Sequence, residues 1–210
     1  MLTVYTFGDS TLDCSHYNDK GVDPGRLIVN NHDQLFPEFR GRDLFSKDEE
    51  TVTDLRAYDG SVVGGLIEQI EDLEVEGPAI ALLTIGGNDL RQSLADGGDF
   101  GAEEFAQSLK RFLDQLPVRP VLIATVYDPS FGDDSLQFFG PDQARGRDIL
   151  RQINALLSHF GQAYGASVDL HGHFLQGQPD WLTDAFEPSL IGTSEIRRCF
   201  LDAIEANGFA

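Results

Sequence analysis

Apolar positions along the chain fall into two patterns, short continuous runs and longer stretches with helical spacing. The runs are rich in β-branched and aromatic residues and are bounded by Gly or Pro, which is typical of strands buried on both faces. We predict strands over residues 2–7, 51–57, 79–85, 121–126 and 166–170. Between them, apolar side chains recur three or four positions apart, the spacing of an amphipathic helix. We predict helices over residues 27–39, 62–73, 102–116, 142–164 and 194–206.

Strand and helix alternate along the whole chain, without an internal repeat or a linker that would separate domains. This alternation predicts the α/β class, with residues 1–210 forming a single domain. The expected architecture is a three-layer α/β/α sandwich around a largely parallel, five-stranded sheet. The run at 79–85 is the most apolar and is expected to form the central strand, whereas the segment 171–192 shows neither pattern and is expected to be irregular.

Two loops stand out between the predicted elements. A Gly-rich loop is expected over residues 95–101. The loop over residues 127–141 carries Phe131, Phe138 and Phe139 among acidic residues. These aromatic side chains either form a lid or wall beside a substrate or anchor the loop to the body of the protein, and the sequence leaves both interpretations open.

The net charge is the feature of the composition that says most about possible partners. The 210 residues include 35 acidic and 15 basic ones, which give a formal net charge of -20 at pH 7. Such a charge repels phosphate backbones and anionic membrane surfaces, so neither is an expected partner. Cys14 and Cys199 lack metal-ligand spacing and predict two reduced thiols, and no run approaches the roughly 18 apolar residues of a membrane span. We therefore expect a cytoplasmic protein without a cofactor or a bound metal.

Small and polar residues follow three of the predicted strands, in clusters that contain Ser10, Gly60 and Asn88. Each cluster taken alone is also explained by a turn or a helix cap. However, the carboxyl ends of parallel strands meet at one edge of a sheet, where ligands bind. We therefore expect Ser10, Gly60 and Asn88 to lie close together in a functional site.

The same clusters carry a resemblance to a known family. The blocks in question are Phe7-Gly8-Asp9-Ser10, Ala57-Tyr58-Asp59-Gly60-Ser61 and Gly86-Gly87-Asn88-Asp89. In this order they resemble the blocks of the SGNH hydrolases, also called the GDSL family of esterases and lipases, over most of the chain. The resemblance implies a flavodoxin-like sandwich and a small-molecule ester as substrate. It also implies Ser10 as the nucleophile, with the Ser10 and Gly60 backbone N–H groups and the Asn88 side chain as oxyanion donors.

These residue types suit such chemistry on physical grounds. A serine hydroxyl becomes a good nucleophile only when a base takes its proton, and the oxyanion that follows needs preorganised donors. Gly60 has no side chain, so its backbone can approach the oxyanion closely. The Asn88 amide donates hydrogen bonds without carrying a charge.

The fourth block of the family is an Asp followed three residues later by His and then usually Pro. Here that block reads Asp184-Ala185-Phe186-Glu187-Pro188, so Glu187 stands where the family has its histidine. An ordinary carboxylate is a weaker base than imidazole by roughly two pKa units, or about 3 kcal/mol. Repulsion between Asp184 and Glu187 would reduce this deficit by raising one of their pKa values.

A base from elsewhere in the chain is the alternative. His171 and His173 follow the fifth predicted strand at the same sheet edge, and we expect one of them to act as the base, oriented by Asp184 or Glu187. Other interpretations are surface or capping histidines, or a pair that holds a metal such as Zn²⁺, although the spacing matches no known ligand pattern. His16 is a less favoured base that is close to Ser10 in sequence.

The sequence therefore predicts a serine ester hydrolase that cleaves small acyl or acetyl esters through an acyl-enzyme on Ser10. Acetylated sugars, short lipid esters and thioesters are the substrates that the resemblance implies. The alternative is a non-catalytic domain of the same fold that binds a carbohydrate or a partner protein, because the histidine of the fourth block is missing. A flavodoxin- or receiver-like ligand domain would explain Asp9 and Asp89 as cation ligands, but not the company of Ser10, Gly60 and Asn88.

Overall fold

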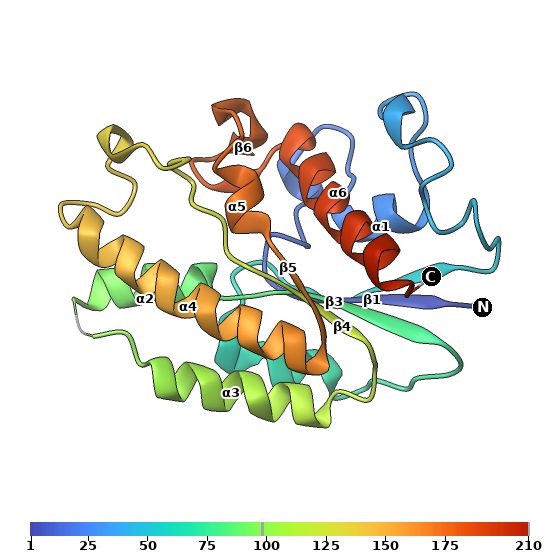
Figure 1. The fold of residues 1–210 in the computed structure, drawn as a ribbon, viewed down its shortest axis with the longest axis horizontal. Helices are drawn as coiled ribbons and strands as arrows, with labels where there is room; N and C mark the ends of the chain where they lie inside the picture. Colours follow the sequence, from blue (N-terminus) through green and yellow to red (C-terminus); the bar gives the residue numbers. More distant parts are fainter. Residues whose placement is uncertain (98, 210) are drawn as a thin grey trace.

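A five-stranded sheet runs through the middle of the protein, and all of its strands are parallel (Figure 1). The structure is a computed structural model and describes residues 1–97 and 99–209. The strand order is β2-β1-β3-β4-β5, the order of flavodoxin-like folds. The strands are β1 (Thr3–Gly8), β2 (Val52–Leu55), β3 (Ala79–Thr84), β4 (Val121–Ala124) and β5 (Gly165–Val168). The predicted fold class and the central position of the third strand are confirmed.

Helices cover both faces of the sheet (Figure 1). The α-helices are α1 (Pro24–Val29), α2 (Gly87–Asp96), α3 (Ala102–Gln115), α4 (Gln143–Tyr164), α5 (Leu170–Phe174) and α6 (Leu190–Asn207). The 3-10 helices are η1 (Ser15–Tyr17), η2 (Pro37–Phe39), η3 (Val63–Ile70), η4 (Asp134–Leu136) and η5 (Pro179–Trp181). A short antiparallel hairpin, β6 (Leu182–Thr183) with β7 (Glu187–Pro188), lies just before the last helix.

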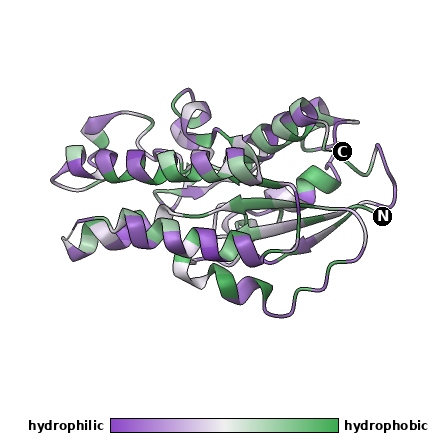
Figure 2. Cartoon of the chain, turned by 60° about the horizontal axis from the view of Figure 1, so that its bottom comes forward, coloured by the Kyte–Doolittle hydropathy of each residue, from purple (hydrophilic) through white to green (hydrophobic). Residues whose placement is uncertain are grey.

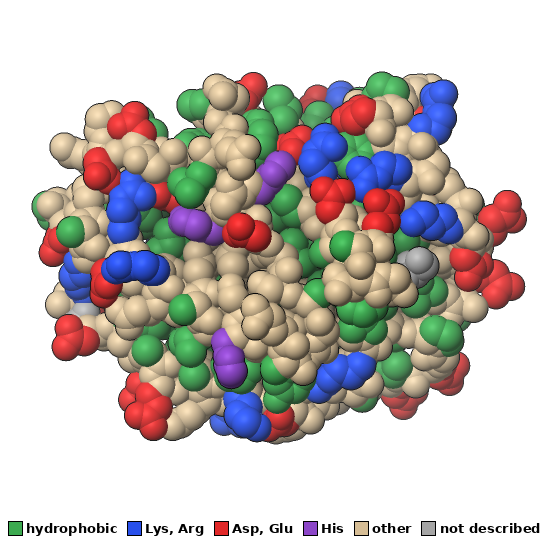
Figure 3. Space-filling view, viewed as in Figure 1, with side chains coloured by type: hydrophobic (Ala, Val, Ile, Leu, Met, Phe, Trp, Pro, Cys, Tyr) green, Lys and Arg blue, Asp and Glu red, His purple; other side chains and the backbone are tan. Residues whose placement is uncertain are grey.

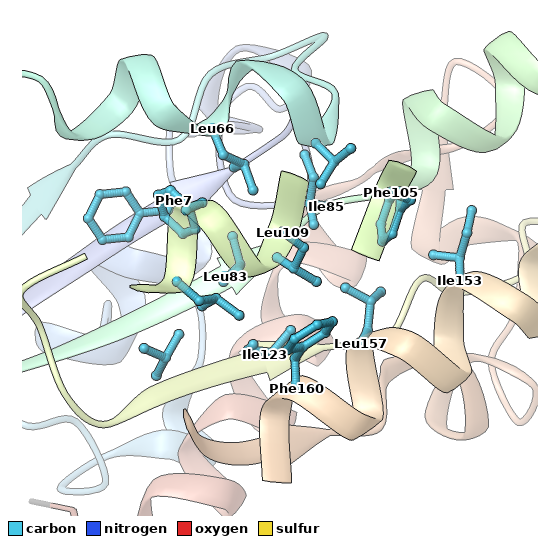
Figure 4. Packing of buried hydrophobic residues seen from close by; sticks show 14 of the residues in the cluster. Phe7, Leu66, Leu83, Ile85, Phe105, Leu109, Ile123, Ile153, Leu157 and Phe160 are labelled. Carbon is cyan, nitrogen blue, oxygen red and sulfur yellow. The ribbon is translucent and has the colours of Figure 1, made fainter. Parts of the chain in front are cut away.

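Two hydrophobic cores hold the layers together, one on each face of the sheet. Successive strand residues alternate between them: Tyr5 and Leu83 belong to the core under α3 and α4, while Val4 and Leu82 belong to the core under α1 and α6. Figure 4 shows side chains of the first core interdigitating between the sheet and the helices. Figure 2 shows the strands as largely hydrophobic and the helices as two-sided. This period-2 burial explains why the strands read as continuous apolar runs in the sequence.

Three predicted elements are corrected by the structure. The helix expected at 27–39 is only α1 followed by η2, because Asn30 ends the first helix and Pro37 begins the second. The helix expected at 62–73 is the 3-10 helix η3. The segment 171–192 is not irregular, since it holds most of α5, the β6–β7 hairpin and the start of α6.

One helix went unrecognised in the sequence. Helix α2 starts at Gly87, directly after β3, and its mean hydropathy is too polar for an apolar stripe to stand out. It ends at Asp96, within the Gly-rich loop expected at 95–101, of which Gly98 lies outside the described residues. The N-terminal turn of α2 therefore carries Asn88 at the carboxyl edge of the sheet.

Acidic side chains are spread over the rim of the face drawn in Figure 3, with arginines and lysines among them. None of the helices in the described part of the chain is long and apolar enough to cross a membrane.

Candidate active site

The site begins where β1 ends. Gly8 adopts a φ of 117°, and a Cβ at this position would lie 1.6 Å from the Thr84 carbonyl oxygen of the neighbouring strand, so only glycine fits. The Gln69 side chain brackets Gly8, accepting from its N–H at 2.8 Å and donating to its carbonyl at 2.8 Å. The chain turns sharply after this clamped glycine and presents Ser10 at the tip of the strand. Ser10 is 8% exposed.

Asp9 anchors the turn that carries Ser10. Its Oδ1 accepts hydrogen bonds from the Thr84 hydroxyl at 2.9 Å and from the Thr11 backbone N–H at 3.1 Å. Burial raises the pKa of Asp9, and the hydrogen bonds oppose the rise. Asp9 thus holds the turn that presents Ser10, and its hydrogen bonds are to the protein itself.

Gly60 is brought next to this turn by hydrogen bonds from the two residues that precede it. The Tyr58 N–H donates to the Gly8 carbonyl at 2.9 Å, and the Asp59 N–H donates to Asp13 Oδ2 at 3.0 Å. Gly60 itself has a φ of 81°, in the left-handed region that favours glycine. The segment after β2 is therefore tied to the segment after β1, as the sequence predicts.

Asn88 completes the group from the first turn of α2. Its Nδ2 donates to the Ser61 carbonyl at 3.0 Å, and its Oδ1 accepts from Arg91 Nη1 at 3.3 Å. These two bonds fix the plane of the amide. A side-chain amide has two N–H donors, so the second remains for a ligand.

The backbone N–H groups of Ser10 and Gly60 have no hydrogen-bond acceptor among the described residues. Buried or half-buried N–H groups without a partner are rare in proteins, because each costs free energy comparable to a lost hydrogen bond. Together with the second Asn88 N–H they are available to a developing negative charge, which is what an oxyanion hole requires.

The carboxylate of Glu187 reaches this group from the β6–β7 hairpin. In the hairpin Glu187 pairs with Thr183, and the connecting turn places Asp184 and Ala185 in the left-handed region, with φ values of 45° and 71°. The buried Tyr127 fixes the turn, because its hydroxyl donates to the Phe186 carbonyl at 2.6 Å. This backbone costs about 1–2 kcal/mol at Ala185 and persists because the hairpin and Tyr127 hold it.

Glu187 is 5% exposed and lies beside the Ser10 side chain. Burial raises the pKa of Glu187, the neighbouring Ser10 hydroxyl lowers it, the charges of Asp59 and Asp9 raise it, and that of Arg91 lowers it, with a net rise. Its Oε2 is buried and has no hydrogen-bond partner within the described residues. Glu187 is therefore a desolvated carboxylate of increased basicity beside the serine.

The other acid of the fourth block is placed differently. Asp184 is exposed at the tip of the hairpin. Its charge acts on Tyr17, whose hydroxyl donates to Asp59 Oδ2 at 2.8 Å. His16 lies on the same side, with Nε2 3.2 Å from Asp59 Oδ2, and is half exposed.

The two histidines expected as bases lie on α5 and are held by other partners. His173 Nε2 is 2.8 Å from Glu195 Oε2 of α6, and its ring packs on Trp181 with 5.2 Å between centroids. Nδ1 of His171 is buried without a partner among the described residues, and its backbone N–H donates to Thr125 at 2.9 Å. Neither histidine lines the cavity that Ser10 lines. The structure thus brings Ser10, Gly60, Asn88 and Glu187 together and leaves His171 and His173 outside that group.

Whether the described residues could bind a metal ion depends on how their acidic, cysteine and histidine side chains are grouped. Across residues 1–97 and 99–209, no three or more His, Cys, Asp or Glu side chains are grouped so that they could hold a metal ion. Asp89, the acid next to Asn88, instead accepts the Val63 backbone N–H on both oxygens at 3.2 Å. Burial raises the pKa of Asp89 to about 6, with the charge of Asp9 contributing.

The sequence model of the GDSL-like lipase/acylhydrolase family matches residues 6–191. The chain belongs to this family. Ester hydrolysis is the general activity that membership of the GDSL-like family supports. Comparison with curated protein sequences gives no match.

Solved structures of several other proteins share the fold. An acetylxylan esterase from Geobacillus stearothermophilus superposes with a TM-score of 0.69 at 18% identity, covering 96% of this chain and 93% of that one. A lipase/acylhydrolase from Enterococcus faecalis gives a TM-score of 0.68 at 16% identity, covering 98% and 96% of the two chains. A member of the lipolytic protein G-D-S-L family from Veillonella parvula gives 0.65 at 18% identity, covering 96% and 97%. At these identities the likeness concerns the fold.

Several residues around this GDSL-type site were not singled out from the sequence. Tyr127 and Gln69 hold the backbone on which Glu187 and Ser10 depend, and Arg91 orients Asn88. Tyr127 follows β4 directly, so its position at a strand end was a usable signal. Gln69 and Arg91 lie on helices with ordinary polar spacing, and no local pattern distinguishes them.

Proposed function

We propose that this protein is a serine ester hydrolase in which Ser10 is the nucleophile and Glu187 is the general base. The observation that carries the proposal is the position of the Ser10 side chain beside a Glu187 carboxylate that is 5% exposed, with a raised pKa. A serine beside a desolvated carboxylate meets the requirement for an activated nucleophile. It also reduces the basicity deficit of a carboxylate relative to imidazole.

The reaction follows from this geometry. Glu187 accepts the Ser10 hydroxyl proton as Oγ attacks the ester carbonyl, and the resulting oxyanion binds the N–H groups of Ser10, Gly60 and Asn88. Protonated Glu187 then gives its proton to the departing alcohol, which leaves the acyl group on Ser10. A water molecule attacks the acyl-enzyme, again losing its proton to Glu187, and Ser10 recovers its hydroxyl proton as the acid departs.

Small acyl or acetyl esters are the proposed substrates. The structural likeness to an acetylxylan esterase supports acetylated carbohydrates as one candidate group. The net charge of -20 favours uncharged esters over strongly anionic ones. Both cysteines are free thiols, which is compatible with the reducing cytoplasm as the proposed location.

A fluorophosphonate probe tests the proposal directly, because it reacts covalently with an activated serine. We expect rapid labelling of Ser10, mapped by mass spectrometry, no labelling of Ser10→Ala, and slow labelling of Glu187→Gln. His171→Ala and His173→Ala are expected to label at the rate of the unmodified protein. Loss of labelling in one histidine variant alone would instead assign the base to that histidine.

The test also separates the enzyme from the non-catalytic alternative. A folded protein that shows no labelling at Ser10 and no turnover of phenyl acetate would reject the acyl-enzyme. A domain that binds a carbohydrate or a partner protein would then be the better interpretation.

A further inference from the structure

Two hollows of different size meet at the catalytic group. A small cavity of about 50 Å³ is lined by Ser10, and an open groove of about 800 Å³ is lined by Gly60. Both hollows share a wall, which we call the divider. It consists of Asn88, Leu90, Arg91, Phe138 and Phe186.

The small cavity is apolar and limited in capacity. Its floor and sides are formed by Ile85, Leu90, Ala124, Val126, Tyr127 and Pro129. A water-sized group needs about 10–15 Å³ of such volume, so the cavity holds roughly three to five groups. That range covers the aliphatic parts of butanoyl and hexanoyl groups, whereas an octanoyl chain exceeds it.

Phe138 belongs to the divider and has no role in the proposed catalytic steps. Its ring meets the Phe186 ring edge-on with 6.1 Å between centroids, and Arg91 covers Phe186 from 4.3 Å. The neighbouring Phe139 is buried against Gly146 of α4, where a Cβ would lie 2.4 Å from it, and this contact fixes the loop. Phe138 is thus held in place between the cavity and the groove.

We propose that Phe138 is a specificity-determining residue that closes the acyl cavity and limits the enzyme to acyl groups of about two to six carbons. The alcohol part of the ester lies in the open groove, whose size admits bulky alcohols. This inference rests on the proposed function, since it takes Ser10 as the acylated residue. It also resolves the role of the aromatic loop, because Phe138 serves as a wall and Phe139 as an anchor.

A chain-length series measures the limit. With p-nitrophenyl esters, we expect kcat/KM to stay within about tenfold from acetate to butanoate and to drop by about 10- to 200-fold at octanoate, as for an overfilled apolar pocket. In Phe138→Ala the octanoate-to-acetate ratio of kcat/KM should rise by at least about tenfold. Phe138→Leu should give an intermediate ratio. Leu136→Ala, an exposed position on the same loop, should keep the ratio of the unmodified protein.

A second series fixes the orientation of the ester. Acetate esters of methanol, phenol and 4-methylumbelliferone enlarge the alcohol at constant acyl size, and all three should be cleaved. Equal rates for acetate and decanoate, or rejection of the bulky alcohols, would overturn the inference while leaving the proposed function intact. An unchanged ratio in a Phe138→Ala protein of normal melting temperature would also overturn it. A protein that cleaves no ester and does not label at Ser10 fails the proposed function first, and the inference falls with it.

Discussion

Glu187 and Glu195 lie close together in the sequence, yet their surroundings shift the carboxyl pKa in opposite directions. Glu195 faces two basic side chains: His173 Nε2 lies at 2.8 Å and the Arg198 guanidinium at 3.0 Å. Burial raises the pKa of Glu195, but the hydrogen bonds from His173 and Arg198 prevail and lower it to about 2. Glu187 is buried beside the Ser10 hydroxyl, with Asp59 and Asp9 as charged neighbours, and its pKa is raised. The histidine paired with an acid is therefore a structural contact here, and the acid that forms no ion pair among the described residues is the candidate base.

The two sites illustrate different uses of the same side chain. A carboxylate held by an arginine and a histidine has little tendency to accept a proton, and the contact with His173 links α5 to α6. A carboxylate in a desolvated position accepts a proton more readily, but its burial lowers the free energy of unfolding. Such a loss of stability is common at catalytic positions. The difference between Glu187 and Glu195 can be tested by measurements of turnover, pH dependence and stability.

The largest expected effect is on turnover. Glu187→Gln should lower kcat/KM by about 10²- to 10⁴-fold, because the amide cannot accept the Ser10 proton. Glu195→Gln is the matched control and should change kcat/KM by less than about threefold. Steady-state kinetics with p-nitrophenyl acetate decide between them, and an equal loss in both variants would contradict the assignment.

A smaller effect is expected at the proposed oxyanion donors. Asn88→Ala should lower kcat by about 10²- to 10³-fold with little change in KM, because the donated hydrogen bond forms chiefly with the transition state. Gln92→Ala, one turn further along α2 on the groove side, serves as the control and should retain kcat. A change confined to KM in Asn88→Ala would assign Asn88 to substrate binding alone.

The pH dependence of kcat/KM distinguishes the two candidate bases. Since Glu187 must be ionised to act, kcat/KM should rise with pH along a limb above the ordinary carboxyl pKa of about 4.3, in line with the raised pKa. Glu187→His should move this limb toward the imidazole pKa of about 6.5. Retention of the original limb in Glu187→His would show that another group is titrating.

The smallest effects concern the free energy of unfolding, and they should have opposite signs. The depressed pKa of Glu195 contributes stability above pH 4.5 that is lost as pH falls toward 2, so Glu195→Gln should destabilise the protein at pH 7 by about 1–2 kcal/mol. The raised pKa of Glu187 contributes stability below pH 4.5 that is lost as pH rises through its folded value. Glu187→Gln should therefore stabilise the protein at pH 7, by about 1 kcal/mol.

Chemical denaturation at pH 4 and pH 7 measures both differences. At pH 4 the gain from Glu187→Gln should largely disappear, because the native carboxyl is then protonated in the folded state. Destabilisation by both substitutions at pH 7 would contradict the interpretation of Glu187 as a buried carboxylate that forms no ion pair among the described residues.

Much of the fold could be predicted from local patterns. The apolar runs gave all five strands of the sheet, because parallel strands covered on both faces must be apolar along their length. The prediction of helices failed where the apolar pattern was weak, at the short α1 and the polar α2. The residues Ser10, Gly60 and Asn88 could be grouped in advance because each follows a strand, and the carboxyl ends of parallel strands share one edge.

The sequence by itself thus determined the α/β class, the family and the grouping of Ser10, Gly60 and Asn88 at one sheet edge. Only the tertiary structure placed Glu187 beside Ser10 and His173 beside Glu195. The physical reason is that the proposed base comes from a two-stranded hairpin whose position depends on long-range contacts, such as the hydrogen bond from Tyr127 to Phe186. The partner of His173 likewise lies on a separate helix, and no local spacing specifies which of two nearby carboxylates a histidine will meet.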